Sequence, residues 1–191
     1  MGQHKFDGKN LDKLDSPERV ERENMEVIWP LLAADEPQVL IDLGAGSGYF
    51  SRQFASKMPE GMIYACDSSP AMVQHMQQVL SAVPGGTIRV VQVEEVRIPL
   101  DDGIADVVFM ANLHHELADS SSSMREVFRL LRSGGTVCVE DWRDGVTANG
   151  PPPEVRVSEA SIVANLLDAG FVGIVSHDVL PQHHLICGRK P

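Results

Sequence analysis

Short aliphatic runs alternate with helical segments along most of this 191-residue chain, and this alternation constrains the fold more than any other feature. The runs expected to form strands are 39–43, 62–66, 88–93, 105–111 and 136–140. Helices are expected near residues 48–57, 69–83, 124–131 and 158–170. Strands that alternate with helices over the length of one domain favour a parallel sheet with helices on both faces. In such a sheet, ligands bind at the carboxyl ends of the strands.

Both ends of the chain depart from this alternation. Residues 1–15 are polar and are predicted to form an arm, and Ser16-Pro17-Glu18 is typical of a helix start. Apolar residues at helical spacing then continue to Leu32. At the other end, two extended runs, 171–180 and 183–187, predict an antiparallel hairpin. We expect one domain over residues 1–191, and a serine run, 120–123, that forms a loop before a helix.

The acidic composition excludes several classes of partner. The net charge is −11, with 16 Lys and Arg against 27 Asp and Glu, which is the wrong balance for binding nucleic acid or an anionic membrane. No segment approaches the roughly 20 apolar residues of a membrane span. The start, MGQHKFDGKN, lacks the apolar stretch of a signal peptide. We therefore expect a cytoplasmic protein with a small-molecule partner and no nucleic-acid or membrane partner.

The cysteines agree with a reducing compartment. Cys66, Cys138 and Cys187 are odd in number, far apart in the sequence, and form no Cys-x-x-Cys pair. Cys66 and Cys138 lie inside apolar runs, so both are predicted to be buried, unreactive thiols.

The stretch VLIDLGAGSGYF, residues 39–50, places three glycines directly after the first aliphatic run. Gly44, Gly46 and Gly48 permit positive φ angles and let the backbone approach a ligand closely, while the helix that follows offers free N–H groups. Asp67 ends the second strand, where a carboxylate can accept hydrogen bonds from both hydroxyls of a ribose. This combination predicts a site for a nucleoside-containing cofactor.

The glycine spacing and a nearby acid distinguish between cofactors. The dinucleotide fingerprint is G-x-G-x-x-G, whereas this chain has G-x-G-x-G. Asp42 lies two residues before the first glycine, where it would repel an anion and attract a cationic amino-acid end. No Tyr-x-x-x-Lys pair for hydride transfer is present. A nicotinamide-dependent oxidoreductase is therefore an alternative, but a weaker one.

These motifs resemble those of class I S-adenosylmethionine-dependent methyltransferases. VLIDLGAGSGYF is similar to their first motif and YACDSSPAMVQHM to their second. VEEVRIPLDDGIADVVFMANLHHEL resembles the third motif and fourth strand of small-molecule methyltransferases similar to the ubiquinone/menaquinone C-methyltransferases. The resemblance covers about residues 36–142. It implies an α/β, Rossmann-like fold with a mostly parallel seven-stranded sheet, an antiparallel C-terminal hairpin and helices on both faces.

The resemblance also implies a set of cofactor-binding residues for S-adenosylmethionine and its product S-adenosylhomocysteine. These residues are Asp42, Gly44, Ala45, Gly46, Gly48, Asp67, Ser68, Met72, Glu94, Glu95 and Asn112. The glycine turn would line the methionine part, with Asp42 near its ammonium group. Asp67 would hold the ribose, Ser68 and Met72 would border the adenine, and Asn112 would present backbone near the sulfonium. Glu94-Glu95 stands where the family often has Asp-Ala, so Glu94 is one methylene longer than the usual adenine partner.

Candidate catalytic groups follow the fourth and fifth strands. Methyl transfer requires alignment, exclusion of water and, for acidic acceptors, a base. NLHHEL contains His114 and His115, and EDWRD spans residues 140–144. Histidine exchanges protons near neutral pH, so His114 and His115 are the candidate catalytic residues, with structural hydrogen bonding as the alternative. Asp141 and Arg143 are expected to form an exposed loop pair, and Trp142 to stack on a ligand or cover the sheet.

A metal site is not expected. His115-Glu116 begins like HExxH, but Asp119 occupies the place of the second histidine. His183 and His184 are adjacent, so in a strand they point to opposite faces.

The family resemblance gives the N-terminal segment a role as well. Residues 1–35 would cap the cofactor cleft, with Phe6, Leu11 and Trp29 as candidate acceptor contacts. The predicted function is S-adenosylmethionine-dependent methyl transfer to a small molecule. A protein that binds the cofactor without catalysis is a further alternative, and the acceptor and oligomeric state are left open.

Overall fold

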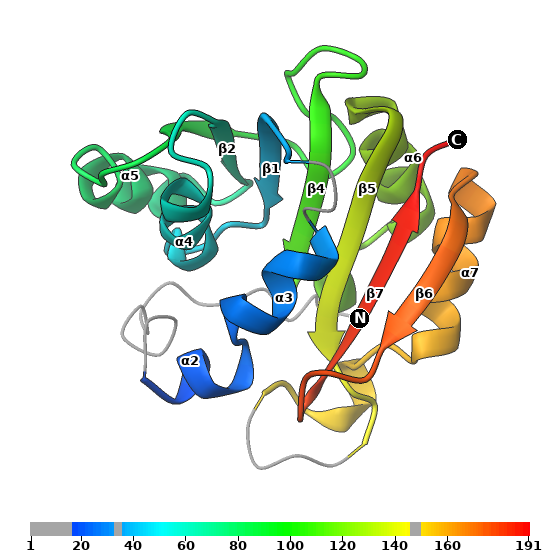
Figure 1. Ribbon diagram of the computed structural model, residues 1–191. Helices are drawn as coiled ribbons and strands as arrows, with labels where there is room; N and C mark the ends of the chain where they lie inside the picture. The colour runs from blue at the N-terminus through cyan, green and yellow to red at the C-terminus, as the bar shows by residue number, and fades with distance from the viewer. Residues whose placement is uncertain (1–16, 33–35, 146–149) are drawn as a thin grey trace.

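The computed structural model describes residues 17–32, 36–145 and 150–191. Within them, seven strands form one sheet in the order β3-β2-β1-β4-β5-β7-β6 (Figure 1). The strands are β1 (Val39–Leu43), β2 (Met62–Asp67), β3 (Thr87–Gln92), β4 (Ala105–Ala111), β5 (Leu131–Trp142), β6 (Val172–His177) and β7 (His183–Arg189). Strands β1 to β5 pair in parallel, and β7 is antiparallel to both β5 and β6. The predicted seven-stranded sheet with its antiparallel hairpin is confirmed.

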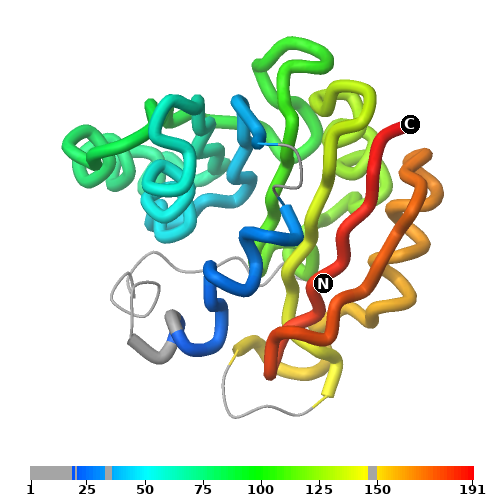
Figure 2. The backbone as a smooth tube through the Cα atoms, in the orientation of Figure 1, coloured from blue at the N-terminus to red at the C-terminus, as the bar shows by residue number. Residues whose placement is uncertain are grey.

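Helices cover both faces of this sheet. They are α2 (Pro17–Arg22), α3 (Met25–Leu32), α4 (Tyr49–Lys57), α5 (Pro70–Val79), α6 (Ser120–Leu130) and α7 (Glu159–Ala169), with short 3₁₀ turns η2 (His114–Glu116) and η3 (Pro153–Val155). Helices α3 and α4 pack with one face of the central strands, and α6 and α7 pack on the other. Figure 2 shows the chain of α2 and α3 crossing toward β4 and β5.

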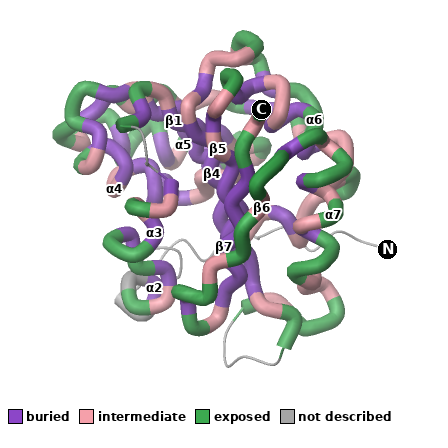
Figure 3. Tube along the Cα trace, turned by 45° about the vertical axis from the view of Figure 1, so that its right-hand side comes forward, coloured by how far each residue is buried: buried purple, intermediate pink, exposed green. Residues whose placement is uncertain are grey.

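The inner strands are rich in apolar residues because both of their faces are covered. In β4, Val108 and Phe109 are both fully buried, but they belong to the cores on opposite faces. The ring of Phe109 lies 4.9 Å from that of Phe50 and 5.4 Å from that of Phe54, both on α4. Figure 3 shows the contrast with the edge strand β6, which is largely exposed.

Three expected boundaries differ, each for a local reason. The single N-terminal helix is two, because Asn24 Oδ1 accepts a hydrogen bond from Glu26 N (2.9 Å) and starts a new helix. Ser120–Ser123 is not a loop but the first turn of α6, because Asp119 Oδ1 caps it by accepting from Ser122 N (2.9 Å). Strand β5 begins at Leu131 rather than at the expected residue 136, and it includes Gly134 and Gly135.

The cysteine prediction is right for Cys66. For Cys138 it is right about burial and wrong about the free thiol. Cys66 is a buried free thiol, and burial raises its pKa. Strands β5 and β7 place Cys138 directly opposite Cys187, with Cα atoms 4.2 Å apart, and the two form a disulfide. Separation along the sequence hid this pairing, because only the order of the strands brings these residues together.

One prediction and one expected absence remain to be compared with the described residues. Residues 1–16, with Phe6 and Leu11, lie outside the described part, so their proposed role stays a prediction. In the parts that the structure describes, no helix is long and apolar enough to cross a membrane.

Candidate functional site

The carboxyl ends of β1, β2, β4 and β5 meet at one edge of the sheet. Register places Leu43 of β1 beside both Cys66 of β2 and Met110 of β4, and Ala111 of β4 beside Glu140 of β5. Asp67 is the last residue of β2. The other candidate residues follow strand ends: the glycine turn follows β1, and Asn112 and the histidine pair follow β4. In Figure 1 this is the lower edge, where the arrowheads of β4 and β5 lie.

The glycine turn requires glycine for two physical reasons. Gly44, Gly46 and Gly48 have φ angles of 76°, 56° and 78°, in the left-handed region that side chains disfavour. A Cβ at Gly44 would lie 2.8 Å from a methyl of Leu113, and one at Gly48 would lie 2.9 Å from a methyl of Leu80. Backbone conformation therefore favours glycine at all three positions, and a side chain at Gly44 or Gly48 would also have to displace a leucine side chain.

Asp67 joins the glycine turn to the turn after β2. Its Oδ2 accepts a hydrogen bond from Gly46 N (2.9 Å) and its Oδ1 accepts from Ser69 N (2.8 Å). Gly44 N and Ala45 N both donate to the backbone carbonyl of Cys66, at 2.8 Å and 3.0 Å. A carboxylate oxygen can accept more than one hydrogen bond, so Asp67 is fixed in place and still able to bind a diol.

Asp42 is fully enclosed beneath the glycine turn. Ser51 Oγ donates a hydrogen bond to its Oδ2 (2.6 Å). Burial raises the pKa of Asp42 to about 6, although the hydrogen bond from Ser51 opposes the shift. Asp42 is therefore ionised at neutral pH and can attract the cationic end of a ligand.

Asn112 supplies a buried acceptor at the end of β4. Its φ of 55° is unusual for a residue with a side chain, and its backbone N donates to the carbonyl of Glu140 (2.8 Å). Its Oδ1 is buried and accepts no hydrogen bond from any described residue. A buried acceptor without a donor, beside the Leu113 that packs on Gly44, fits a site that a polar ligand completes.

The residues expected near the adenine differ in their exposure and in their contacts. Met72 is buried in the first turn of α5, while Ser68 is exposed. Glu94 is exposed and its backbone pairs with Arg97. Glu95 turns elsewhere, since its Oε1 accepts from the backbone N–H groups of Ala118 and Asp119. Glu95 thereby holds the loop before α6, and its role toward the cofactor stays a prediction.

His115 and Asp141 form a buried pair between the ends of β4 and β5. His115 Nδ1 lies 2.7 Å from Asp141 Oδ1, and the backbone N of His115 donates to Asp141 Oδ2 (3.0 Å). Burial disfavours the charged imidazole, but the hydrogen bond and charge of Asp141 outweigh it and raise the pKa of His115. Such a pair fixes the ring and leaves Nε2 available to accept a proton.

The neighbours of this pair differ from expectation. Asp141 is fully buried in β5 rather than exposed in a loop, and Arg143 pairs with Asp178 instead. His114 is also buried, and burial lowers its pKa, so it is neutral at pH 7. Of the two candidate histidines, only His115 is held by a carboxylate.

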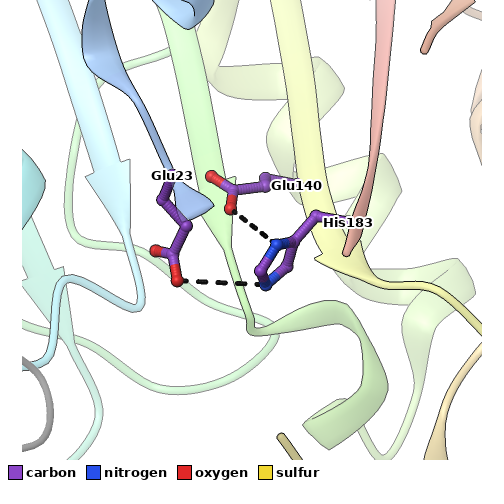
Figure 4. A group of neighbouring side chains, drawn as sticks. All are labelled: Glu23, Glu140 and His183. Carbon is purple, nitrogen blue, oxygen red and sulfur yellow. Dashed lines mark ion pairs between the residues drawn. The ribbon is translucent and has the colours of Figure 1, made fainter. Parts of the chain in front are cut away.

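A second buried cluster lies on the other face of β5. Glu23 follows α2, Glu140 lies near the end of β5, and His183 begins β7 (Figure 4). Burial and the neighbouring Glu23 raise the pKa of Glu140 well above its usual value, while burial lowers the pKa of His183 to about 3. The ring of Trp142 covers His183 at 4.2 Å between centroids. The sequence did not indicate that these three residues meet, and the one signal was an acid, Glu140, at the end of the run 136–140.

The family described as a methyltransferase domain matches residues 41–139, so this chain belongs to that family. This match confirms the resemblance to class I S-adenosylmethionine-dependent methyltransferases. The cofactor of this family is S-adenosylmethionine.

Individual relatives and structures agree. The chain is 27% identical to a SAM-dependent methyltransferase from Aquifex aeolicus, with a TM-score of 0.86 over 96% of this chain and 98% of that one. It is 27% identical to the ubiquinone/menaquinone biosynthesis C-methyltransferase UbiE of Idiomarina loihiensis over 57% of this chain and 44% of that protein. An uncharacterized 37.1 kDa transposon protein of Streptomyces fradiae is 26% identical over 85% of this chain and 47% of its own length. The chain thus spans less than half of these two curated relatives.

Proposed function

We propose that this chain transfers the methyl group of S-adenosylmethionine to a small molecule that carries an acidic O–H, S–H or C–H group. The observation that carries the proposal is the His115–Asp141 pair, held at 2.7 Å at the strand edge that also bears the glycine turn. Family membership favours methyl transfer over the nicotinamide-dependent alternative.

The chain's own residues explain how the cofactor would be held. When bound, S-adenosylmethionine supplies an electrophilic methyl group on a sulfonium. The carboxylate of Asp67 would bind the ribose hydroxyls, since Gly46 N and Ser69 N already fix its orientation. Asp42, ionised above about pH 6, would attract the ammonium end. Ser68 and Met72 would border the adenine, and Asn112 would face the methionine part.

His115 would act on the acceptor. Asp141 holds Nδ1, so Nε2 would take the proton that the acceptor loses as the acceptor bonds to the methyl carbon. The bond from that carbon to sulfur would break in the same step, leaving S-adenosylhomocysteine. The carboxylate of Asp141 then stabilises the resulting imidazolium. A base of this kind contributes about 10² to 10⁴ in rate.

The acidic net charge of −11 supports a small acceptor rather than a nucleic acid. UbiE, one of the relatives, acts in ubiquinone and menaquinone biosynthesis by its name. We extend the proposal to one domain over residues 1–191 in which residues 1–35 cover the acceptor. Within that segment, the ring of Trp29 lies 6.1 Å from that of Phe54 and is partly exposed. A cytoplasmic location stays a prediction.

The test is methyl transfer from labelled S-adenosylmethionine to a panel of small phenols, quinols, thiols and enolisable acids. We expect His115→Gln to lower kcat about 10²-fold or more with the acceptor that works best, and to change cofactor affinity less than twofold. His177→Gln, on the edge strand β6, is the control and should retain full activity. Cofactor binding without transfer to any acceptor would instead support the non-catalytic alternative.

A further inference from the structure

The cluster of Glu23, Glu140 and His183 is distinct from the His115–Asp141 pair. Neighbouring residues of β5 point to opposite faces, so Glu140 and Asp141 face different sides of the sheet. Figure 4 shows the three side chains of the cluster directed toward one another from three segments far apart in the sequence. Their relative exposures are 1% for Glu23 and 0% for Glu140 and His183.

The polar side-chain atoms of Glu140 and His183 lack hydrogen bonds to the described residues. Both carboxylate oxygens of Glu140 and both ring nitrogens of His183 are buried and have no hydrogen-bonding partner among the described residues. The nearest contacts are longer than hydrogen bonds. Glu23 Oε1 lies 3.9 Å from His183 Nε2, and Glu140 Oε1 lies 3.8 Å from His183 Nδ1. Buried charged groups are normally paired or coordinate a metal ion.

We propose that Glu23, Glu140 and His183 bind one divalent transition-metal ion. One ligand atom from each side chain can be chosen so that all three lie within 4.8 Å of one another. Around a zinc ion with bonds of about 2.0–2.2 Å, ligand atoms are about 3.4 Å apart. Glu23 and Glu140 face different nitrogens of His183, so an ion on one nitrogen requires the carboxylate that faces the other nitrogen to move closer. An imidazole with two carboxylates suits Zn²⁺, Fe²⁺, Co²⁺ or Mn²⁺ better than Ca²⁺ or Mg²⁺.

The residues around the cluster are arranged to hold its ligands. Arg19 Nε lies 2.6 Å from Glu23 Oε2, which fixes this carboxylate and leaves Oε1 toward His183. Trp142 covers the imidazole of His183 from the side. Partners of this kind orient metal ligands and exclude solvent from the ion.

The number of protein ligands leaves an open coordination position. The two carboxylates would balance one divalent ion. Arg22 lies 3.9 Å from Glu23 Oε1, and its Nε is buried without a hydrogen bond from or to any described residue. Three protein ligands leave at least one position free. A water molecule or a small anion could occupy that position near Arg22.

The experiment is a titration of the metal-depleted full chain, without an affinity tag, with Co²⁺ followed by visible absorption and with Zn²⁺ followed by calorimetry. We expect one ion per chain. Glu140→Gln and His183→Gln should each weaken binding at least 30-fold. His184→Gln is the matched control, because His184 lies next in the strand but faces Glu159 (3.4 Å) and Asp144 (3.9 Å), and it should change binding less than twofold.

The result of the metal titration can be distinguished from misfolding of a variant and from failure of the proposed methyl transfer. Circular dichroism and thermal unfolding without metal would show that each variant is folded. Wild-type protein that binds no stoichiometric ion, or binding lost in His184→Gln but kept in Glu140→Gln, overturns the metal site. Because the titration contains neither cofactor nor acceptor, its failure leaves the proposed methyl transfer intact.

Discussion

Glu140 and Asp141 are adjacent on β5 and both are fully buried, but they differ in their hydrogen-bonding partners. Asp141 accepts from the backbone N–H groups of His115 and Trp142 and pairs with the His115 ring. Glu140, on the other face, accepts no side-chain hydrogen bond from the described residues. Its nearest basic neighbour, His183, lies 3.8 Å away.

This difference in hydrogen bonding indicates two different roles for a buried carboxylate. A carboxylate with all its partners in the protein stabilises the fold and orients another side chain. A carboxylate without partners costs stability and persists where a ligand completes it. We therefore assign Asp141 to positioning His115, and Glu140 to binding an ion.

The largest expected effect comes from Asp141→Asn. The amide puts an NH₂ group where a carboxylate now faces N–H donors, so the free energy of unfolding should fall by about 2–4 kcal/mol. Urea unfolding at pH 7 measures it. A loss below about 1 kcal/mol would mean that the hydrogen bonds of Asp141 contribute little, and the contrast with Glu140 would disappear.

Asp42 provides an intermediate case, since Ser51 holds it and burial raises its pKa to about 6. If its ionised form attracts the ammonium of the cofactor, affinity for S-adenosylmethionine should rise about fivefold to tenfold between pH 5 and pH 7. Asp42→Asn should bind more weakly at pH 7 and lose most of this dependence. Calorimetry at several pH values would show it, and an unchanged profile in the variant would assign the dependence to another group.

Glu140→Gln should have a smaller effect on stability. In the presence of a chelator, we expect the free energy of unfolding to change by less than about 1 kcal/mol or to increase, because a buried acid without partners is replaced by a neutral amide of the same size. The same urea experiment serves for both β5 variants. A loss as large as that of Asp141→Asn would show that Glu140 has a stabilising partner in the metal-free protein.

The smallest expected effect is a pH dependence from His115. Its folded-state pKa is raised, so its charged form contributes stability that is fully present below the unfolded value near 6.5 and is lost as pH rises through the folded value. The free energy of unfolding should therefore decline over that window in the wild type and decline less in His115→Gln. Identical slopes in the two proteins would contradict the pairing with Asp141.

Much of the fold could be predicted from local patterns. The strand 105–111 was expected at its observed bounds, because aliphatic residues buried on both faces form a continuous run. The glycine turn and Asp67 were also identifiable, since strand, glycines and acid follow one another at short range. The loop predicted for the serine run 120–123 was wrong, because the cap at Asp119 outweighs the weak helix preference of serine.

The rest depended on contacts between distant segments. The sequence indicated that His183 and His184 face opposite sides, and the register of β7 with β5 agrees, pairing His183 with Trp142 and His184 with Asp141. Nothing in the local sequence indicated that Glu23 would meet His183. The disulfide from Cys138 to Cys187 was missed for the same reason, because it depends on β7 inserting between β5 and β6.

The central claim is that Asp67 and the glycine turn bind the nucleoside of S-adenosylmethionine, and calorimetry tests it most directly. We expect the purified chain to bind S-adenosylmethionine and S-adenosylhomocysteine but not NAD⁺. Asp67→Ala should weaken both by about 1.5–3 kcal/mol, while Glu60→Ala, an exposed acid before the same strand, should have no effect. Absence of binding to either sulfur nucleoside, or equal affinity in Asp67→Ala, would contradict the account.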